Sequence, residues 1–300
     1  MDGLVKLSFY CFTAASISLA GAAICYVVYA VGRIRVRRTV LATTAGTTYT
    51  SSSTEFGPGS IAASRFGTLL AWFGVVFQAL AVLLRVIAAD RGPYSNMYEF
   101  SLAFVLAVTL IYLIFERMYD TKQLGAIILP IAFGMVLYIW SLPTSMREVD
   151  PLNPALQNQP MMTAHVSMAI LSYATFAVAF AASVLYLVAV RRRISWLPSA
   201  DMLDDIGYRA VTVGFPLLAL AVILGSVWAH DAWGSYWSWD PKETSALFTW
   251  LIYGVYLHTR SLRGWRGSRS AVILILGFAA VVFTYYGNYF FGGMHAYGGV

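Results

Sequence analysis

Apolar residues in this chain are grouped into long runs, with few of the short periodic patches typical of a soluble domain. A helix that crosses the hydrocarbon core of a bilayer needs roughly 20 apolar residues, and eight stretches approach or exceed that length. They cover residues 8–31, 66–88, 99–116, 124–141, 163–190, 208–228, 244–259 and 271–291. The stretch 163–190 is long enough to tilt or to extend beyond the lipid. The pattern predicts an all-α polytopic membrane protein with about eight transmembrane helices.

The composition supports a lipid environment. Hydrophobic residues make up 59% of the 300 residues and charged residues 11%, and the mean hydropathy is +0.68. A soluble domain has about a quarter of its residues charged. The 9 Trp and 19 Tyr suit aromatic belts at two membrane interfaces.

The basic residues predict the orientation of the chain. Most of the 20 lie in alternate connecting segments, with clusters at 33–38, 191–193 and 260–269. Positive charges are retained on the cytoplasmic side, so both termini are predicted to lie outside. The net charge of +6 is therefore a topology signal, and no nucleic-acid partner is predicted.

The chain divides into two predicted parts. Residues 1–65 read as an N-terminal anchor helix followed by a flexible cytoplasmic linker, since 39–64 is rich in Thr, Ser, Gly and Ala. A basic cluster follows the first apolar run, unlike in a signal peptide. Residues 66–300 form the main transmembrane domain. Cys11 and Cys25 form no C-x-x-C pair and no C-x-x-C-H haem-attachment motif, so any haem that this chain handles would not be bound to it through thioether bonds.

The outer segment 228–243 reads W-A-H-D-A-W-G-S-Y-W-S-W-D-P-K-E. It holds four tryptophans, Trp228, Trp233, Trp237 and Trp239. An interfacial belt explains one or two of them. Four so close together favour a platform for a flat, largely apolar ligand such as a porphyrin, a quinone or a sterol.

Asp240 begins the run Asp-Pro-Lys-Glu, which is a helix start with a capping Asp, a Pro in the first turn and Glu243 three residues after the cap. We therefore expect Asp240 mainly to cap the seventh span and to mount the tryptophan segment on it. A role at a ligand is compatible with capping.

Two histidines are predicted at the level of the tryptophan segment. His165 lies at the outer start of the fifth span, and His295 lies just beyond the outer end of the eighth. A bis-His haem takes one axial nitrogen from each side of the porphyrin plane. Two imidazoles around an aromatic platform favour that ligation, although either one alone is more typical of an interfacial polar residue.

Three other polar residues have open interpretations. His258 is predicted deep in the seventh span, where an imidazole indicates function unless it snorkels beside Arg260. Its second ligand would have to come from elsewhere. His230 is a secondary candidate, because Asp231 next to it makes a simple polar pair. Arg85 either snorkels or meets an anionic ligand group.

These segments resemble a known family. The run W-G-S-Y-W-S-W-D-P-K-E-T is similar to the tryptophan-rich (WWD) signature of haem-handling proteins of cytochrome c maturation, most closely the CcsA/ResC branch. L-I-Y-G-V-Y-L-H-T-R, ending at Arg260, resembles its intramembrane histidine segment. H-V-S-M-A-I-L-S-Y-A from His165 and G-N-Y-F-F-G-G-M-H-A-Y from Gly287 resemble its external histidine segments. The outer loop R-G-P-Y-S-N-M-Y-E from Arg91 also fits.

The resemblance covers about residues 66–298, with two departures. His230 stands where Asn or Glu is expected, and Ala296 where Ser is expected. Residues 1–65 show little family signal.

The resemblance implies a CcsA/ResC-type subunit of a haem exporter and cytochrome c synthase. Haem b, bound non-covalently, would enter at His258 and reach His165, His295 and the tryptophan segment, where the C-x-x-C-H thiols of apocytochrome c add to its vinyl groups. A CcsB/ResB-type partner would supply a further intramembrane His and would be needed for synthase activity, with thiol-reducing proteins as possible partners. The expected location is the bacterial plasma membrane, or the thylakoid membrane in a plastid.

Two other functions stay open at this point. A haem chaperone of the CcmC type would pass haem to another carrier, but that branch has fewer spans. A quinone-binding or transporter subunit would bind no haem and would be insensitive to changes at His165 or His295.

Overall fold

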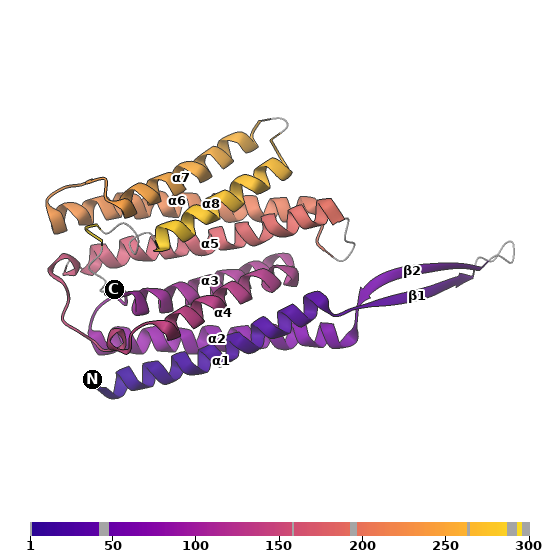
Figure 1. Cartoon of the computed structure of the whole chain (residues 1–300), viewed down its shortest axis with the longest axis horizontal. Coiled ribbons are helices and arrows are strands. Elements are labelled where there is room, and N and C mark those ends of the chain that lie inside the picture. The colour runs from indigo at the N-terminus through magenta and orange to yellow at the C-terminus, as the bar shows by residue number, and fades with distance from the viewer. Residues whose placement is uncertain are drawn as a thin grey trace.

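Long helices of the computed structural model run side by side along one direction (Figure 1). The structure describes residues 2–41, 48–157, 159–192, 197–262, 265–286 and 293–295. Its long helices are α1 (Asp2–Val31), α2 (Pro58–Ala89), α3 (Met97–Tyr119), α4 (Gly125–Ser141), α5 (Gln159–Arg192), α6 (Ala200–Trp233), α7 (Pro241–Arg260) and α8 (Ser268–Tyr286). Short 3₁₀ turns η1 (Lys122–Leu124), η2 (Thr144–Arg147) and η3 (Pro154–Leu156) lie in the connections. The predicted all-α polytopic class is confirmed.

The chain reverses direction at every connection between the helices, so the connections collect at two ends (Figure 1). One end, called here the tryptophan end, holds the starts of α3, α5 and α7 and the segment 234–240. The other, the arginine end, holds the last turns of α5 and α7 with Arg191, Arg192 and Arg260. This sorting agrees with the two classes of segment that the sequence predicts.

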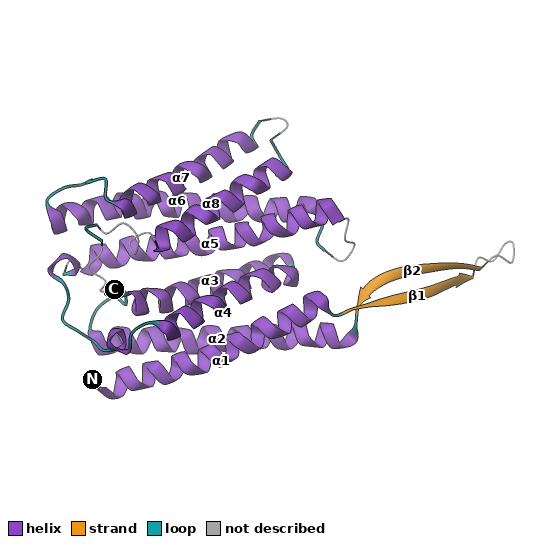
Figure 2. Ribbon diagram, in the orientation of Figure 1, coloured by secondary structure: helices purple, strands orange, loops and turns teal. Residues whose placement is uncertain are grey.

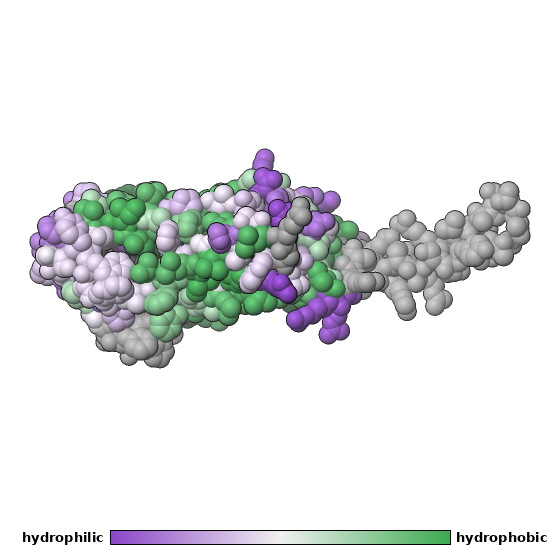
Figure 3. All heavy atoms as spheres, turned by 90° about the horizontal axis from the view of Figure 1, so that it is seen from above, coloured by the Kyte–Doolittle hydropathy of each residue, from purple (hydrophilic) through white to green (hydrophobic). Residues whose placement is uncertain are grey.

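Seven of the eight long helices in the described residues have the length and apolarity to cross a membrane. The exception is α7, which has 20 residues but carries Lys242, Glu243 and several hydroxyl side chains in its first turns. The predicted seventh span, 244–259, is thus present as a helix but is more polar than the others. Apolar side chains cover the middle of the bundle surface, and polar ones gather toward its ends (Figure 3).

Between α1 and α2 the backbone forms a two-stranded antiparallel hairpin, β1 (Arg33–Leu41) and β2 (Thr48–Phe56), paired from Arg33 with Phe56 to Leu41 with Thr48. The hairpin projects beyond the arginine end (Figure 2). The sequence predicts a flexible linker in this segment, and the two strands are not predicted. β-branched residues favour a pleated conformation, and they are mainly Ile and Val in β1 and Thr in β2.

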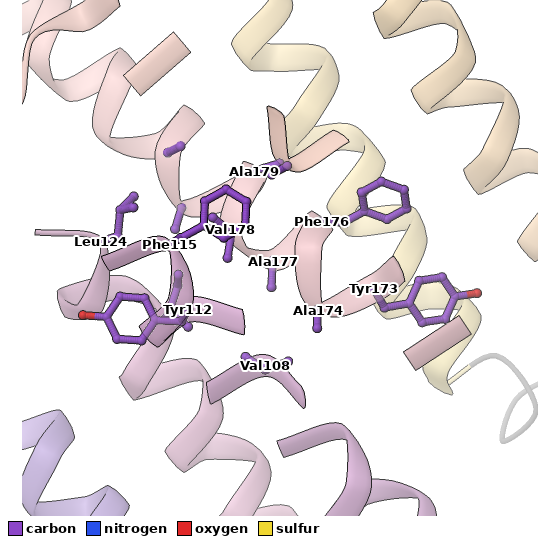
Figure 4. Close-up of a cluster of buried hydrophobic side chains, with 14 of the residues drawn as sticks. Val108, Tyr112, Phe115, Leu124, Tyr173, Ala174, Phe176, Ala177, Val178 and Ala179 are labelled. Carbon is purple, nitrogen blue, oxygen red and sulfur yellow. The ribbon is translucent and has the colours of Figure 1, made fainter. Parts of the chain in front are cut away.

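The centre of the bundle is packed through small residues of α5. Ala174 and Ala177 are fully or almost fully buried where α5 crosses α3, close to Val108 and Tyr112 (Figure 4). Small side chains let helices approach closely in membrane proteins, where packing drives association. On the other side of α5, the ring of Phe176 stacks on Tyr253 of α7 with centroids 3.6 Å apart. α5 therefore joins the first four helices to the last three.

Candidate functional site

A cavity opens at the tryptophan end between α3, α5, α6, α7 and α8. Its volume is about 140 Å³, and the space continues to the outside of the bundle. The walls are mainly aromatic and aliphatic, and both His165 and His295 line them. The lining has the apolar and aromatic character that suits a flat ligand.

His165 projects from the second turn of α5 toward α6. Its Nδ1 lies 2.6 Å from the backbone carbonyl oxygen of Ala221. A carbonyl only accepts hydrogen bonds, so Nδ1 donates its proton and the lone pair of Nε2 stays free. The imidazole is parallel to the indole of Trp228, with ring centroids 6.1 Å apart and planes 9° apart.

Gly225 makes room for this imidazole. A Cβ at this position would lie 2.5 Å from Cε1 and 2.6 Å from Nδ1 of His165. Real Cβ atoms do not approach other atoms so closely, so a larger residue would push the ring away from Ala221. The absence of a side chain on this turn of α6 fixes where His165 sits.

Asp240 holds the second cavity imidazole, that of His295. Its Nδ1 lies 2.9 Å from Oδ1 of the carboxylate, and the side chain is 10% exposed. The imidazole also packs edge-on against Trp233, with centroids 4.9 Å apart. A carboxylate that accepts from Nδ1 orients the ring and leaves Nε2 as the nitrogen for a metal. Trp228 lies 5.8 Å from this ring, so both imidazoles flank one indole.

Asp240 makes further hydrogen bonds besides the one with His295. Its carboxylate accepts from the backbone N–H groups of Lys242 at 2.9 Å and Met294 at 2.6 Å. The Glu243 carboxylate accepts from the N–H of Asp240 at 3.2 Å, which completes the predicted capping box. The Asp240 carboxylate thus both caps α7 and holds the His295 imidazole.

The hydrogen bonds at Asp240 and His295 set their protonation. Burial alone raises the pKa of Asp240, but the bonds from His295, Lys242 and Met294 outweigh it and lower this pKa to about 2. For His295, burial lowers the pKa, and this outweighs the opposing effect of Asp240, while Lys242 lowers it further. His295 therefore stays neutral, as a metal ligand must. Both groups have a lower pKa in the folded protein than in the unfolded chain. The stability linked to each group is therefore fully present at a pH above the pKa of the unfolded chain, and it is lost as the pH falls through the pKa of the folded protein.

The four tryptophans play different parts. Trp228 is 2% exposed, and its Nε1–H donates to the carbonyl of Ala155 at 3.1 Å. Trp233 packs edge-on against Trp228 at 4.8 Å. Trp237 lines the cavity, whereas Trp239 is 69% exposed with a left-handed φ of 59°. Two indoles therefore face the cavity, one supports His295, and one faces outward.

Two predicted histidines lie elsewhere. His258 is exposed on the last turn of α7 at the arginine end, far along that helix from Asp240. His230 stacks on Tyr236 with centroids 4.2 Å apart and lies 3.7 Å from Asp231, which fits the polar-pair interpretation. Of the His295 segment, residues 287–292 and Ala296 lie outside the described residues.

Arg85 has a structural role that the sequence does not reveal. It is 2% exposed, and its Nε donates to Glu99 at 2.8 Å. Its other nitrogens donate to the backbone carbonyls of Met146, Arg147 and Glu148. Within the described part of the chain Arg85 does not line the cavity, so neither snorkelling nor an anionic ligand is needed to explain it.

Glu99 ties the outer loop to this cluster. Its second oxygen accepts from Arg91 at 2.9 Å and from the N–H of Ser95 at 2.9 Å. The loop is also close to α5, since a Cβ on Gly92 would meet Thr163 Oγ1 at 2.3 Å. The loop residues 94–96 form part of the cavity wall. Glu99 is not among the site residues predicted from the sequence, and its hydrogen bonds to Arg91 and Ser95 hold this part of the wall in place.

Comparisons with known proteins identify relatives of this chain. The family model for "Cytochrome C assembly protein" matches residues 94–295. The chain is 39% identical over 235 residues to cytochrome c biogenesis protein CcsA of Chlamydomonas reinhardtii, covering 74% of this chain and 66% of that relative, just under two thirds of its length. It is 36% identical over 272 residues to CcsA of Synechococcus elongatus, covering 73% and 83%. For CcsA of Guillardia theta the identity is 39% over 242 residues, covering 71% and 79%.

The fold is similar to a solved structure as well. The chain superimposes on cytochrome c haem lyase CcmF with a TM-score of 0.61 at 18% identity, covering 94% of this chain and 46% of that one. At this identity the likeness concerns the fold. The helical arrangement around the cavity thus has a counterpart in a protein about twice as long.

Proposed function

This chain belongs to the cytochrome c assembly protein family and within it to the CcsA proteins, and we propose that it handles haem during cytochrome c biogenesis. In this proposal the cavity at the tryptophan end holds haem b non-covalently, as cargo, and presents it to an apocytochrome c. Both the membrane-spanning helices and the apolar cavity suit a flat cofactor that moves between lipid and protein.

The proposal rests on two imidazoles that line one cavity and have the same hydrogen-bonding pattern. His165 and His295 each use Nδ1 within the protein, toward Ala221 and Asp240 respectively. In this proposal Nε2 of each imidazole would bind the iron, which takes axial nitrogens from two sides of a porphyrin. Trp228 and Trp237 line the same cavity and offer indole faces to the macrocycle.

The chemistry needs positioning more than proton transfer. Addition of a cysteine S–H across a haem vinyl group forms one C–S bond and one C–H bond, with no other atoms gained or lost. The side chains described here hold the cargo by its iron and exclude water, so the vinyl edges meet the thiols at high effective concentration. Reducing proteins that keep those thiols free are expected partners.

His258 belongs to the entry step in this proposal. It is exposed at the arginine end of α7, so a second histidine could reach it only from another chain. We assign that chain to a CcsB/ResB-type membrane protein, and synthase activity to the complex. The location is a bacterial plasma membrane or a thylakoid membrane, with the cavity on the outer face.

The test is a spectrum of the full chain purified together with its partner. Wild-type protein should show a low-spin haem spectrum, and replacement of both His165 and His295 by Ala should abolish the low-spin signal of the cavity. His230→Ala is the matched control, because His230 pairs with Tyr236 and Asp231 instead. An unchanged spectrum in the double variant would overturn the proposal.

A further inference from the structure

Lys242 supplies a positive charge to the wall of the cavity. It follows Asp240 and Pro241 in the first turn of α7, and its side chain lines the cavity beside Glu243. Its Nζ lies 5.8 Å from the ring centroid of Phe100, over the face of the ring. Such a cation–π contact contributes about 0.5–2 kcal/mol, and Lys242 is only partly buried.

The polar groups around Lys242 are already engaged with other donors. The Oε2 of Glu243 accepts from the N–H groups of Ser238 and Asp240, at 2.9 Å and 3.2 Å. The Asp240 carboxylate accepts from His295, from Met294 and from the N–H of Lys242 itself. Among the residues that the structure describes, no oxygen lies within hydrogen-bonding distance of Lys242 Nζ. Lys242 therefore lines a largely apolar cavity without a hydrogen-bond acceptor from the described part of the chain.

We infer that Lys242 binds a carboxylate of the ligand in this cavity. The inference rests on the proposed function, under which that carboxylate is a propionate of haem. An ammonium–carboxylate contact in a water-poor site is a charge-assisted hydrogen bond, stronger than a neutral one. The contact also gives a hydrogen-bond acceptor to Lys242, which has none among the residues that the structure describes.

The contact determines how the porphyrin is turned within its plane. Axial histidines fix the iron but leave rotation about the axis through it free. The two propionates of haem lie on one edge of the macrocycle and the two vinyl groups on the others. A propionate at Lys242 therefore turns the vinyl groups away from the start of α7. Lys242 is a specificity-determining residue that selects porphyrins with free carboxylates and sets their orientation.

The test compares two iron porphyrins on the full chain purified in detergent. Haemin carries free propionates, and haemin dimethyl ester has both esterified while its iron and vinyl groups are unchanged. Each is titrated into wild type, Lys242→Met and Lys242→Arg, and binding is followed by absorbance. Lys6→Met is the matched control, because Lys6 is an exposed lysine near the start of α1, at the same end of the bundle.

Wild type should bind haemin about tenfold more tightly than the ester, and Lys242→Met should remove this preference by weakening haemin alone. Lys242→Arg should retain most of it, Lys6→Met all of it, and every variant should keep the low-spin spectrum. Equal weakening of both ligands, or no change in either, would overturn the inference. If wild type bound neither porphyrin, the proposed function itself would fail. Because the preference is measured first in wild type, the inference stays falsifiable even if Lys242→Met does not fold.

Discussion

The starts of α3 and α7 are built on the same plan and support different chemistry. Each begins with a side-chain cap, Asn96 or Asp240, and each has a glutamate three residues on, Glu99 or Glu243, that accepts from the preceding backbone. At α3 the buried carboxylate meets two guanidinium groups, which are always charged. At α7 the cap carboxylate meets an imidazole. The partner, more than the carboxylate, distinguishes the two clusters: guanidinium groups at α3 and an oriented imidazole at α7.

The largest effect is expected at the α3 cluster. Glu99→Gln leaves Arg85 and Arg91 buried without a counter-charge, and breaking a buried ion pair costs roughly 3–5 kcal/mol. The measurement is the yield and apparent melting temperature of the detergent-purified chain. Glu148→Gln is a suitable control, because only the backbone carbonyl of Glu148 binds Arg85. Normal stability of Glu99→Gln would show that this cluster is not the structural one.

A smaller effect, with a different signature, is expected at α7. Asp240→Asn keeps a capping side chain but removes the charge that orients His295, and such a change typically costs about 10–100-fold in metal affinity. We expect haem affinity to fall by that factor while the melting temperature changes by only a few degrees. Haem titration and thermal unfolding of the same sample check both. A loss of folding with retained affinity would reverse the comparison between α3 and α7.

The smallest effect is expected at Gly225 of α6, where the backbone packs against the His165 imidazole. Gly225→Ala displaces His165 without touching either carboxylate, and overpacking of this kind costs about 1–3 kcal/mol. Haem affinity should fall about tenfold, and the low-spin signal should become mixed with high-spin. Ser226→Ala, next in sequence but bonded to Tyr236, controls for local damage on α6. Unaltered ligation in Gly225→Ala would mean that His165 can be held by other contacts.

Long apolar runs and cap motifs were enough to predict the helices and the α7 capping box, because both depend on residues close together in the chain. The spacing of the spans also predicted that His165 and His295 lie at the same end, and the structure places both at one cavity. Their role as ligands stays a prediction.

The pairings across helices could not be predicted from the sequence. The contacts of Asp240 with His295, Arg85 with Glu99 and Gly225 with His165 depend on how each helix is rotated about its axis. A single sequence constrains that rotation poorly, since polar residues in a span look alike whether they face lipid, a cavity or a neighbour. The hairpin was missed for another reason. Its second strand is rich in Thr and Ser, a composition that linkers and strands share.

The length of α5 and α6 has a consequence for how cargo leaves. Each has 34 residues, which at 1.5 Å per residue gives about 51 Å, against a hydrocarbon thickness of about 30 Å. His165 lies six residues after the first residue of α5, about 9 Å along the axis. A flat ligand beside His165 is therefore close to the end of the helix. A short peptide that arrives through water could reach the edge of this ligand there while its own backbone stays hydrated, because it would not have to enter the acyl chains of the lipid.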